Sequence, residues 1–199
     1  LDRPVIVGIL NVTPDSFSDG GRLPTVAAAV ARAGELLDGG ATMLDVGGES
    51  TRPGRPAPVP ADEEIARVAP VVEALRKRWP AVPLSVDTVK ADTARAVLAA
   101  GASAINDVSG LRLDPAMAGV VAQAGAGLVV MHSRGTVATM ASHDEAEYGG
   151  DVVGGVIAEL RQAVERATAA GVSTDRIVVD PGFGFSKTAD QNILLADQL

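Results

Sequence analysis

Polar side chains recur along the chain, each within or directly after a short apolar run. The positions are Asn11, Asp45, Asp87, Asn106 with Asp107, His132 and Asp180. Asp and Asn are common turn formers and helix caps, which would explain any one of them alone. The whole set needs another reason, because Asp87 and Asp180 follow runs typical of buried strands, where a carboxylate requires a ligand or a partner.

A ring of carboxylates and amides around an apolar pocket suits a flat heterocycle with several N–H donors and acceptors. A carboxylate accepts two parallel N–H bonds from an amino-pyrimidinone edge, and an asparagine amide both donates and accepts. Nearby apolar residues would supply a floor and a stacking face, although ordinary core packing explains them equally well. These residues are Val108, Met131, Phe183 and Phe185.

The composition restricts the classes of protein. The 199 residues are 47% hydrophobic and 21% charged, which predicts one globular domain spanning residues 1–199. Cysteine is absent, so thiolate catalysis, disulfides and thiolate-bound metals are excluded. No apolar run approaches the roughly 20 residues of a membrane span, and no signal segment opens the chain, so we expect a cytoplasmic protein without a membrane partner. The net charge of −8 argues against nucleic acid and leaves room only for a local anion site.

Short β-branched runs that could position these groups alternate with helical patterns. Being apolar on both faces, they predict parallel strands covered by helices. They are Pro4 to Leu10, Thr42 to Val46, Leu84 to Val86, Ala104 to Ile105, Gly127 to Met131 and Ile177 to Val179. Helical spacing of Ile65, Val68, Val72 and Leu75 illustrates the intervening pattern. Asp114 and Pro115 predict a helix cap followed by a first helical proline. Six βα units result.

Repeated βα units admit a (β/α)₈ barrel or an open doubly wound sheet. We expect the TIM barrel, because the long polar connections follow the strands and because no Gly-x-Gly-x-x-Gly follows the first strand. Six units do not close an eight-stranded barrel. The segment from Gln191 to Leu199 has the pattern of opening turns of a helix, so we expect a barrel truncated after its sixth strand, at the start of helix six.

Longer motifs resemble one family, the dihydropteroate synthases. Residues 7–21, with the sequence VGILNVTPDSFSDGG, resemble the first family signature, and residues 45–54, DVGGESTRPG, resemble the second. Shorter matches follow in the family's order at residues 85–88, 105–110, 131–132 and 180–185. Together they span essentially the whole chain.

The resemblance implies an enzyme that joins 6-hydroxymethyl-7,8-dihydropterin diphosphate to p-aminobenzoate, releasing diphosphate. It implies pterin contacts from Asp87, Asn106 and Asp180, with Val108, Met131 and Phe185 around the ring. Asn11 matches the residue associated with Mg²⁺ and the diphosphate. Thr51 and Arg52 match p-aminobenzoate and anion contacts, and Asp87 and Arg52 would assist the chemistry. A homodimer is implied for a full-length member of the family and not for a chain that lacks its late helices.

The sequence also departs from the family. A lysine after a seventh strand and an Arg-x-His group after an eighth have no counterpart, and Ser186 replaces a usual glycine. We expect Lys187 only to decorate the start of helix six, and His132 to orient the fifth loop. Two alternatives remain: a pterin-binding methyltransferase domain acting on methyltetrahydrofolate, which need not carry residues 14–21 and 50–54, and a non-catalytic pterin-binding fragment.

Overall fold

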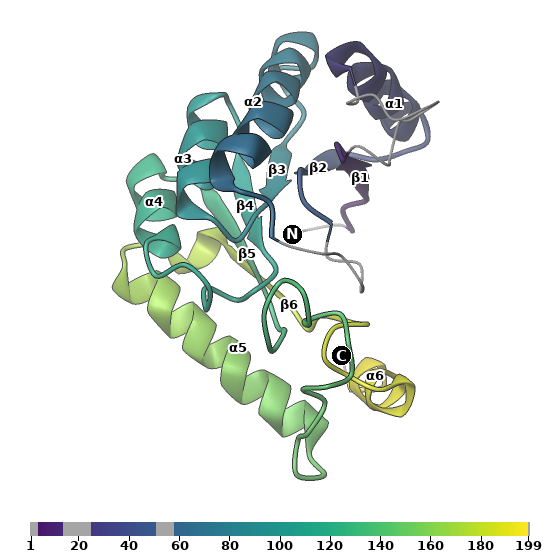
Figure 1. Cartoon of the computed structure of the whole chain (residues 1–199), viewed down its shortest axis with the longest axis vertical. Helices are drawn as coiled ribbons and strands as arrows, with labels where there is room; N and C mark the ends of the chain where they lie inside the picture. The colour runs from purple at the N-terminus through teal and green to yellow at the C-terminus, as the bar shows by residue number, and fades with distance from the viewer. Residues whose placement is uncertain (1–3, 14–24, 51–57, 199) are drawn as a thin grey trace. The chain divides into compact units, whose positions relative to one another are not determined.

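The computed structural model describes residues 4–13, 25–50 and 58–198. Strands and helices alternate along the chain (Figure 1). The strands are β1 (Val7–Asn11), β2 (Met43–Gly47), β3 (Leu84–Asp87), β4 (Ala104–Asp107), β5 (Gly127–Met131) and β6 (Ile177–Asp180). The helices are α1 (Val26–Asp38), α2 (Ala61–Arg78), α3 (Ala91–Ala99), α4 (Met117–Ala124), α5 (Val152–Ala169) and α6 (Ala189–Ala196), with a 3₁₀ turn at Thr174–Arg176.

The chain folds as two compact units. The first unit comprises residues 1–50 and 59–106, and the second comprises 51–58 and 107–199. In the first unit, β1, β2, β3 and β4 pair in parallel and in chain order. Helix α2 packs against both α1 and α3, and it buries Val68, Val72 and Leu75 as the helical spacing predicts. In the second unit, β5 and β6 pair in parallel, and α5 packs against α4 and α6.

All six predicted strands are present, and five extend past their predicted carboxyl ends, four of them by a polar residue. Asn11, Asp87, Asp107 and Asp180 are the last residues of their strands rather than the first residues of the following loops. The reason is the parallel ladder, which continues through these polar positions: Asn11 is opposite Gly47, and Asp87 is opposite Asn106. Ladder membership holds the backbone of these residues in place, so their side chains start from rigid positions.

Two local predictions are wrong. Helix α4 begins at Met117 rather than at Pro115, because the Asp114 carboxylate accepts the Ala116 N–H and forms a local turn before the helix. Strands β1 and β6 are also not buried on both faces, because Ile9 is 65% exposed and Val179 is 52% exposed. No part of the chain that the structure describes covers those side chains.

No helix among the described residues combines the length and apolarity needed to cross a membrane.

Candidate ligand site at the strand ends

A short hydrogen-bond chain links three strands of the first unit. The Asp45 carboxylate, on β2, accepts the Ser85 hydroxyl of β3 at 2.5 Å and the Asn106 amide N–H of β4 at 3.1 Å. The ladder explains the meeting, because Asp45 is opposite Ser85, and Asn106 is one strand further on. Burial raises the pKa of Asp45, while the bonds from Ser85 and Asn106 work in the opposite direction. Asp45 therefore acts as a fixed acceptor that orients the Asn106 amide.

The Asn106 carbonyl oxygen is the unpaired end of this chain. Its Oδ1 atom is buried and accepts no hydrogen bond from any residue that the structure describes. An unsatisfied buried acceptor costs about 1–3 kcal/mol, so proteins rarely keep one without a partner or a ligand. With its N–H group held by Asp45, Asn106 presents an acceptor suited to a ligand N–H.

Asn11 and Asp87 flank a small space above Gly47. A Cβ built on Gly47 would lie 3.2 Å from Asn11 Oδ1 and 3.9 Å from Asp87 Oδ2. The space above Gly47 is therefore tight for a side chain, and it is bounded by one amide oxygen and one carboxylate oxygen. Both oxygens lie on the same side of Gly47, which makes them candidates to contact one polar ligand group.

The Asn11 and Asp87 oxygens fit Mg²⁺ only if a bound substrate supplies further ligands. No group of three or more His, Cys, Asp or Glu side chains suited to a metal occurs among the described residues. Mg²⁺ is commonly held by one or two carboxylates, with substrate phosphates and waters completing its octahedral shell. Asn11 and Asp87 match that sparse pattern, so the site suits a metal that arrives with a phosphorylated ligand.

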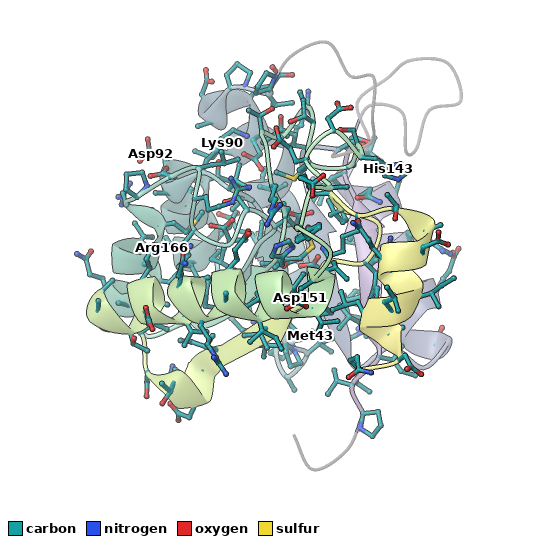
Figure 2. The ribbon with its side chains drawn as sticks, turned by 90° about the horizontal axis from the view of Figure 1, so that it is seen from below. Met43, Lys90, Asp92, His143, Asp151 and Arg166 are labelled. Carbon is teal, nitrogen blue, oxygen red and sulfur yellow. The ribbon has the colours of Figure 1, made fainter. Side chains whose placement is uncertain are left out.

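An ionic cluster holds Glu49, which lies within the second signature. Lys90, labelled in Figure 2, is the residue directly before α3, and its ammonium contacts Glu49 at 2.6 Å and Glu64 at 2.9 Å. Burial alone would lower the pKa of Lys90, but the two carboxylates outweigh it and raise that pKa. Glu49 also accepts the Val59 N–H at 2.6 Å, which ties residue 49 to residue 59 across the second signature.

In the second unit, Asp180 ends β6 beside Met131 of β5. Its carboxylate accepts the Gly182 N–H at 2.7 Å, and its backbone oxygen accepts the His132 N–H at 2.8 Å. A side chain at Gly182 would clash with the His132 carbonyl, and its φ of +69° also favours glycine. The turn after Asp180 is thus pressed against the end of β5. Met131 is buried, and Phe185 is half-buried at the far side of this turn.

Lys187 precedes α6, as predicted, but it is buried there rather than merely decorating the start of the helix. Its side chain is fully inaccessible, and its ammonium lies 2.9 Å from His132 Nδ1, 2.9 Å from the Gly182 oxygen and 3.0 Å from the Phe185 oxygen. His132 Nε2 in turn lies 3.1 Å from Glu159 Oε2. His132 therefore does connect the fifth loop to its surroundings, through both ring nitrogens.

Ser186 shows why the family usually has glycine at this position. Its φ is +51°, in the left-handed region that side chains rarely adopt. Its hydroxyl offsets the strain by donating towards the Met140 oxygen at 3.0 Å and by accepting the Arg134 N–H at 3.0 Å.

The predicted site residues are distributed over both units. Asn11, Asp87 and Asn106 belong to the first, and Val108, Met131, Asp180 and Phe185 belong to the second. Thr51 and Arg52, and the first-loop segment from Asp15 to Asp19, lie outside the described residues. Sequence reasoning missed the hydrogen bond from Ser85 to Asp45 and the burial of Lys187. Ser85 carried a usable signal, since it is a polar residue inside an otherwise apolar strand.

A succession of parallel βα units with acids and amides at the strand ends defines a class of ligand-binding barrel, and the comparisons identify it. The chain belongs to the pterin-binding enzyme family, whose model, described as "Pterin binding enzyme", matches residues 7–199. The fold is therefore that of a (β/α)₈ barrel, with six βα units present in this chain.

Within the family, the chain is similar to dihydropteroate synthases. It is 43% identical to the enzyme of Synechocystis over 197 residues and 43% identical to that of Bacillus subtilis over 198. It covers 66% and 65% of those proteins, and they cover 99% and 100% of this chain. The chain thus spans just under two thirds of the length of these curated relatives.

Solved structures of dihydropteroate synthases are also similar to this chain. A Clostridium difficile dihydropteroate synthase crystallised in the presence of pteroic acid is 41% identical, with a TM-score of 0.89 over 98% of this chain and 70% of that one. A Xanthomonas albilineans enzyme in complex with 7,8-dihydropteroate is 44% identical, with a TM-score of 0.83 over 98% of this chain and 67% of that one.

Proposed function

We propose that this protein is a transferase of folate biosynthesis that condenses 6-hydroxymethyl-7,8-dihydropterin diphosphate with p-aminobenzoate to give 7,8-dihydropteroate and diphosphate. The observation that carries the proposal is the buried, unpaired Asn106 oxygen on its Asp45 support. Kinship with dihydropteroate synthases, at 43% identity over nearly the whole chain, supports the same reaction.

Pterin recognition is assigned to three residues at strand ends. Asn106 Oδ1 would accept an N–H of the ring, while Asp87 and Asp180 would accept the remaining N–H groups as carboxylates. Val108, Met131 and Phe185 would supply apolar contact to the ring. Val108 and Met131 are each 5% exposed, which is compatible with a floor beneath a bound ligand.

The condensation breaks the bond between the pterin methylene carbon and the diphosphate oxygen, and forms a bond from that carbon to the arylamine nitrogen. The amine loses one proton, which passes to the released diphosphate or to solvent water. Positive charge develops at the methylene as diphosphate leaves, and the Asp87 carboxylate would stabilise it. Arg52 and Thr51 would contact p-aminobenzoate and an anionic group of the substrates, so that the amine approaches the methylene carbon in line.

Mg²⁺ is proposed as the cofactor, with Asn11 as its ligand from this chain. When bound, Mg²⁺ would neutralise charge on the leaving diphosphate. Asn11 Oδ1 faces the space above Gly47, near the Asp87 carboxylate, and this oxygen pair is the support for the assignment.

The remaining assignments concern the whole protein. We propose a single pterin-binding domain in a cytoplasmic enzyme that forms a homodimer when full-length. We also propose small molecules as its partners, to the exclusion of nucleic acid and membranes, in keeping with the net charge of −8. Relatives include a Yersinia pestis enzyme solved with a sulfonamide drug, so sulfonamides are proposed as inhibitors.

The test incubates the intact protein with both substrates and Mg²⁺ and follows 7,8-dihydropteroate by mass spectrometry. Product that disappears with chelator and returns with Mg²⁺ would support the proposal. A protein that binds a pterin with high affinity yet forms no product under these conditions would instead be a non-catalytic pterin-binding protein.

A further inference from the structure

Lys187 is completely buried in the second unit, and its three donors are all used. Burying an ammonium ion costs several kcal/mol unless every N–H finds an acceptor. Here the acceptors are His132 Nδ1 at 2.9 Å and the backbone oxygens of Gly182 and Phe185 at 2.9 and 3.0 Å. Two of these acceptors lie in the turn that directly follows Asp180.

The proton positions around Lys187 follow from the contacts. Burial, together with the charge of Lys187, lowers the pKa of His132 to about 4, so the ring is neutral near pH 7. Its Nδ1 faces an ammonium and must be the acceptor, which leaves the Nε2–H to donate to Glu159. Glu159 also accepts hydrogen bonds from Arg134. Lys187 therefore donates to His132 and His132 donates to Glu159, and Glu159 is the shared acceptor of His132 and Arg134.

This chain fastens the turn that carries Asp180. Within the turn, the Phe185 N–H bonds to the Gly182 oxygen at 3.1 Å, and the Gly182 N–H bonds to the Asp180 carboxylate at 2.7 Å. The Lys187 ammonium binds the oxygens of both Gly182 and Phe185. Without it, the Phe185 oxygen and His132 Nδ1 would lose this donor, and the Gly182 oxygen would keep only the Phe185 N–H.

We propose that the protonated Lys187 is a positioning residue for the pterin site, which holds Asp180 and Phe185 in their binding arrangement through the turn from Gly182 to Phe185. The inference rests on the proposed function, because it takes Asp180 as a pterin contact. It assigns Lys187 no contact with the substrate, and it makes ligand affinity depend on one buried proton.

The environment of Lys187 places this proton in an accessible pH range. Burial lowers the pKa of Lys187 to about 8, with the nearby Arg134 acting in the same direction and the carboxylates of Asp180 and Glu159 opposing it. These groups come from β6, α5 and the loop after β5, and neutral His132 completes the set facing the ammonium. The ordered turn is complete below about pH 8 and loses one donor as the pH rises through that value.

Folding stability responds in the opposite direction. The unfolded chain binds this proton with the ordinary pKa of 10.5, and the folded chain with a pKa of about 8. Between these values the unfolded state binds more protons, so the contribution of Lys187 to stability rises with pH. Affinity for the pterin and stability of the fold should therefore diverge on the alkaline side, which simple alkaline unfolding would not produce.

The experiment measures binding of pteroic acid to the intact protein by calorimetry from about pH 6.5 to about 9.5, alongside urea unfolding at each pH. The titration of free pteroic acid is measured separately in buffer, and its contribution is subtracted from the binding data. Lys187→Arg keeps a positive charge throughout this pH range. Lys77→Met replaces an exposed lysine on α2 and serves as the control. We expect the wild type and Lys77→Met to lose up to about tenfold in affinity per pH unit above about 8. Lys187→Arg should bind more weakly at pH 7 and show no such loss.

Three results would overturn the inference: a flat wild-type profile, a Lys187→Arg profile that falls with the wild type, or unfolding stability that falls in parallel with affinity. The wild-type profile decides the question even if Lys187→Arg does not fold. Failure of the proposed function looks different, since a protein that binds no pterin at any pH would remove Asp180 from the site altogether.

Discussion

Replacing Asp45 with alanine tests whether the acid of β2 acts through Asn106. The Asp45 carboxylate holds the Asn106 amide at 3.1 Å and leaves Asn106 Oδ1 as a buried, unpaired acceptor. If Asp45 orients that acceptor, its loss should weaken pterin binding although it touches no ligand itself.

The magnitude follows from the bond that is removed. A hydrogen bond to a charged partner contributes about 1.5–3 kcal/mol. Since Asn106 would otherwise rotate, most of that energy should appear as lost pterin affinity, roughly 10- to 100-fold. Burial raises the pKa of Asp45, so removing this buried carboxylate also removes an unfavourable desolvation of the folded state. That gain offsets part of the loss in folding stability. Stability should therefore fall less than the two lost hydrogen bonds alone would suggest.

The assay is a double-mutant cycle on pterin binding, measured by calorimetry, with Asp45→Ala, Asn106→Ala and both together. Once Asn106 is absent, Asp45→Ala should cost little further affinity, giving a coupling energy of about 1.5–3 kcal/mol. Ser85→Ala is the matched control, because it removes the other hydrogen bond of Asp45 and leaves the Asn106 contact in place. Two losses that simply add would refute the positioning role.

The remaining predictions concern single residues. Asp180→Ala should abolish pterin binding in calorimetry while the far-UV circular dichroism stays unchanged; retained affinity would remove Asp180 from the site. Arg52→Lys should reduce turnover and raise the KM for p-aminobenzoate more than it weakens pterin binding, and equal losses would contradict that division. His132, with its pKa lowered to about 4, binds a proton more weakly than the unfolded chain does, so stability should fall as the pH drops from about 6.5 towards 5, by up to about 1.4 kcal/mol per unit. Urea unfolding should show a smaller slope in His132→Gln than in the wild type. The exposed His143→Gln should keep the wild-type slope, and equal slopes in all three proteins would exclude His132 as the cause.

The order of strands and helices, and the polar residues at the strand ends, were predictable from local pattern. Short β-branched runs between amphipathic segments identify strands without knowledge of their partners, because burial on both faces acts on each run separately. Parallel strands in chain order then bring their carboxyl ends to one edge, which is how Asn11, Asp87 and Asn106 were identified as neighbours. The two long motifs at residues 7–21 and 45–54 also indicated the family by resemblance.

The tertiary structure alone decided which polar residues serve as supports. Lys187 sits just before a helix, where a lysine is ordinarily solvated, and only the packing of the turn from Gly182 to Phe185 onto His132 makes it a buried ammonium with three acceptors. Asp45 and Asn106 are 61 residues apart, and their bond depends on strand register. Local sequence encodes residue type and backbone preference, whereas burial and hydrogen-bond partners arise from contacts between distant segments, and these set the pKa of each group.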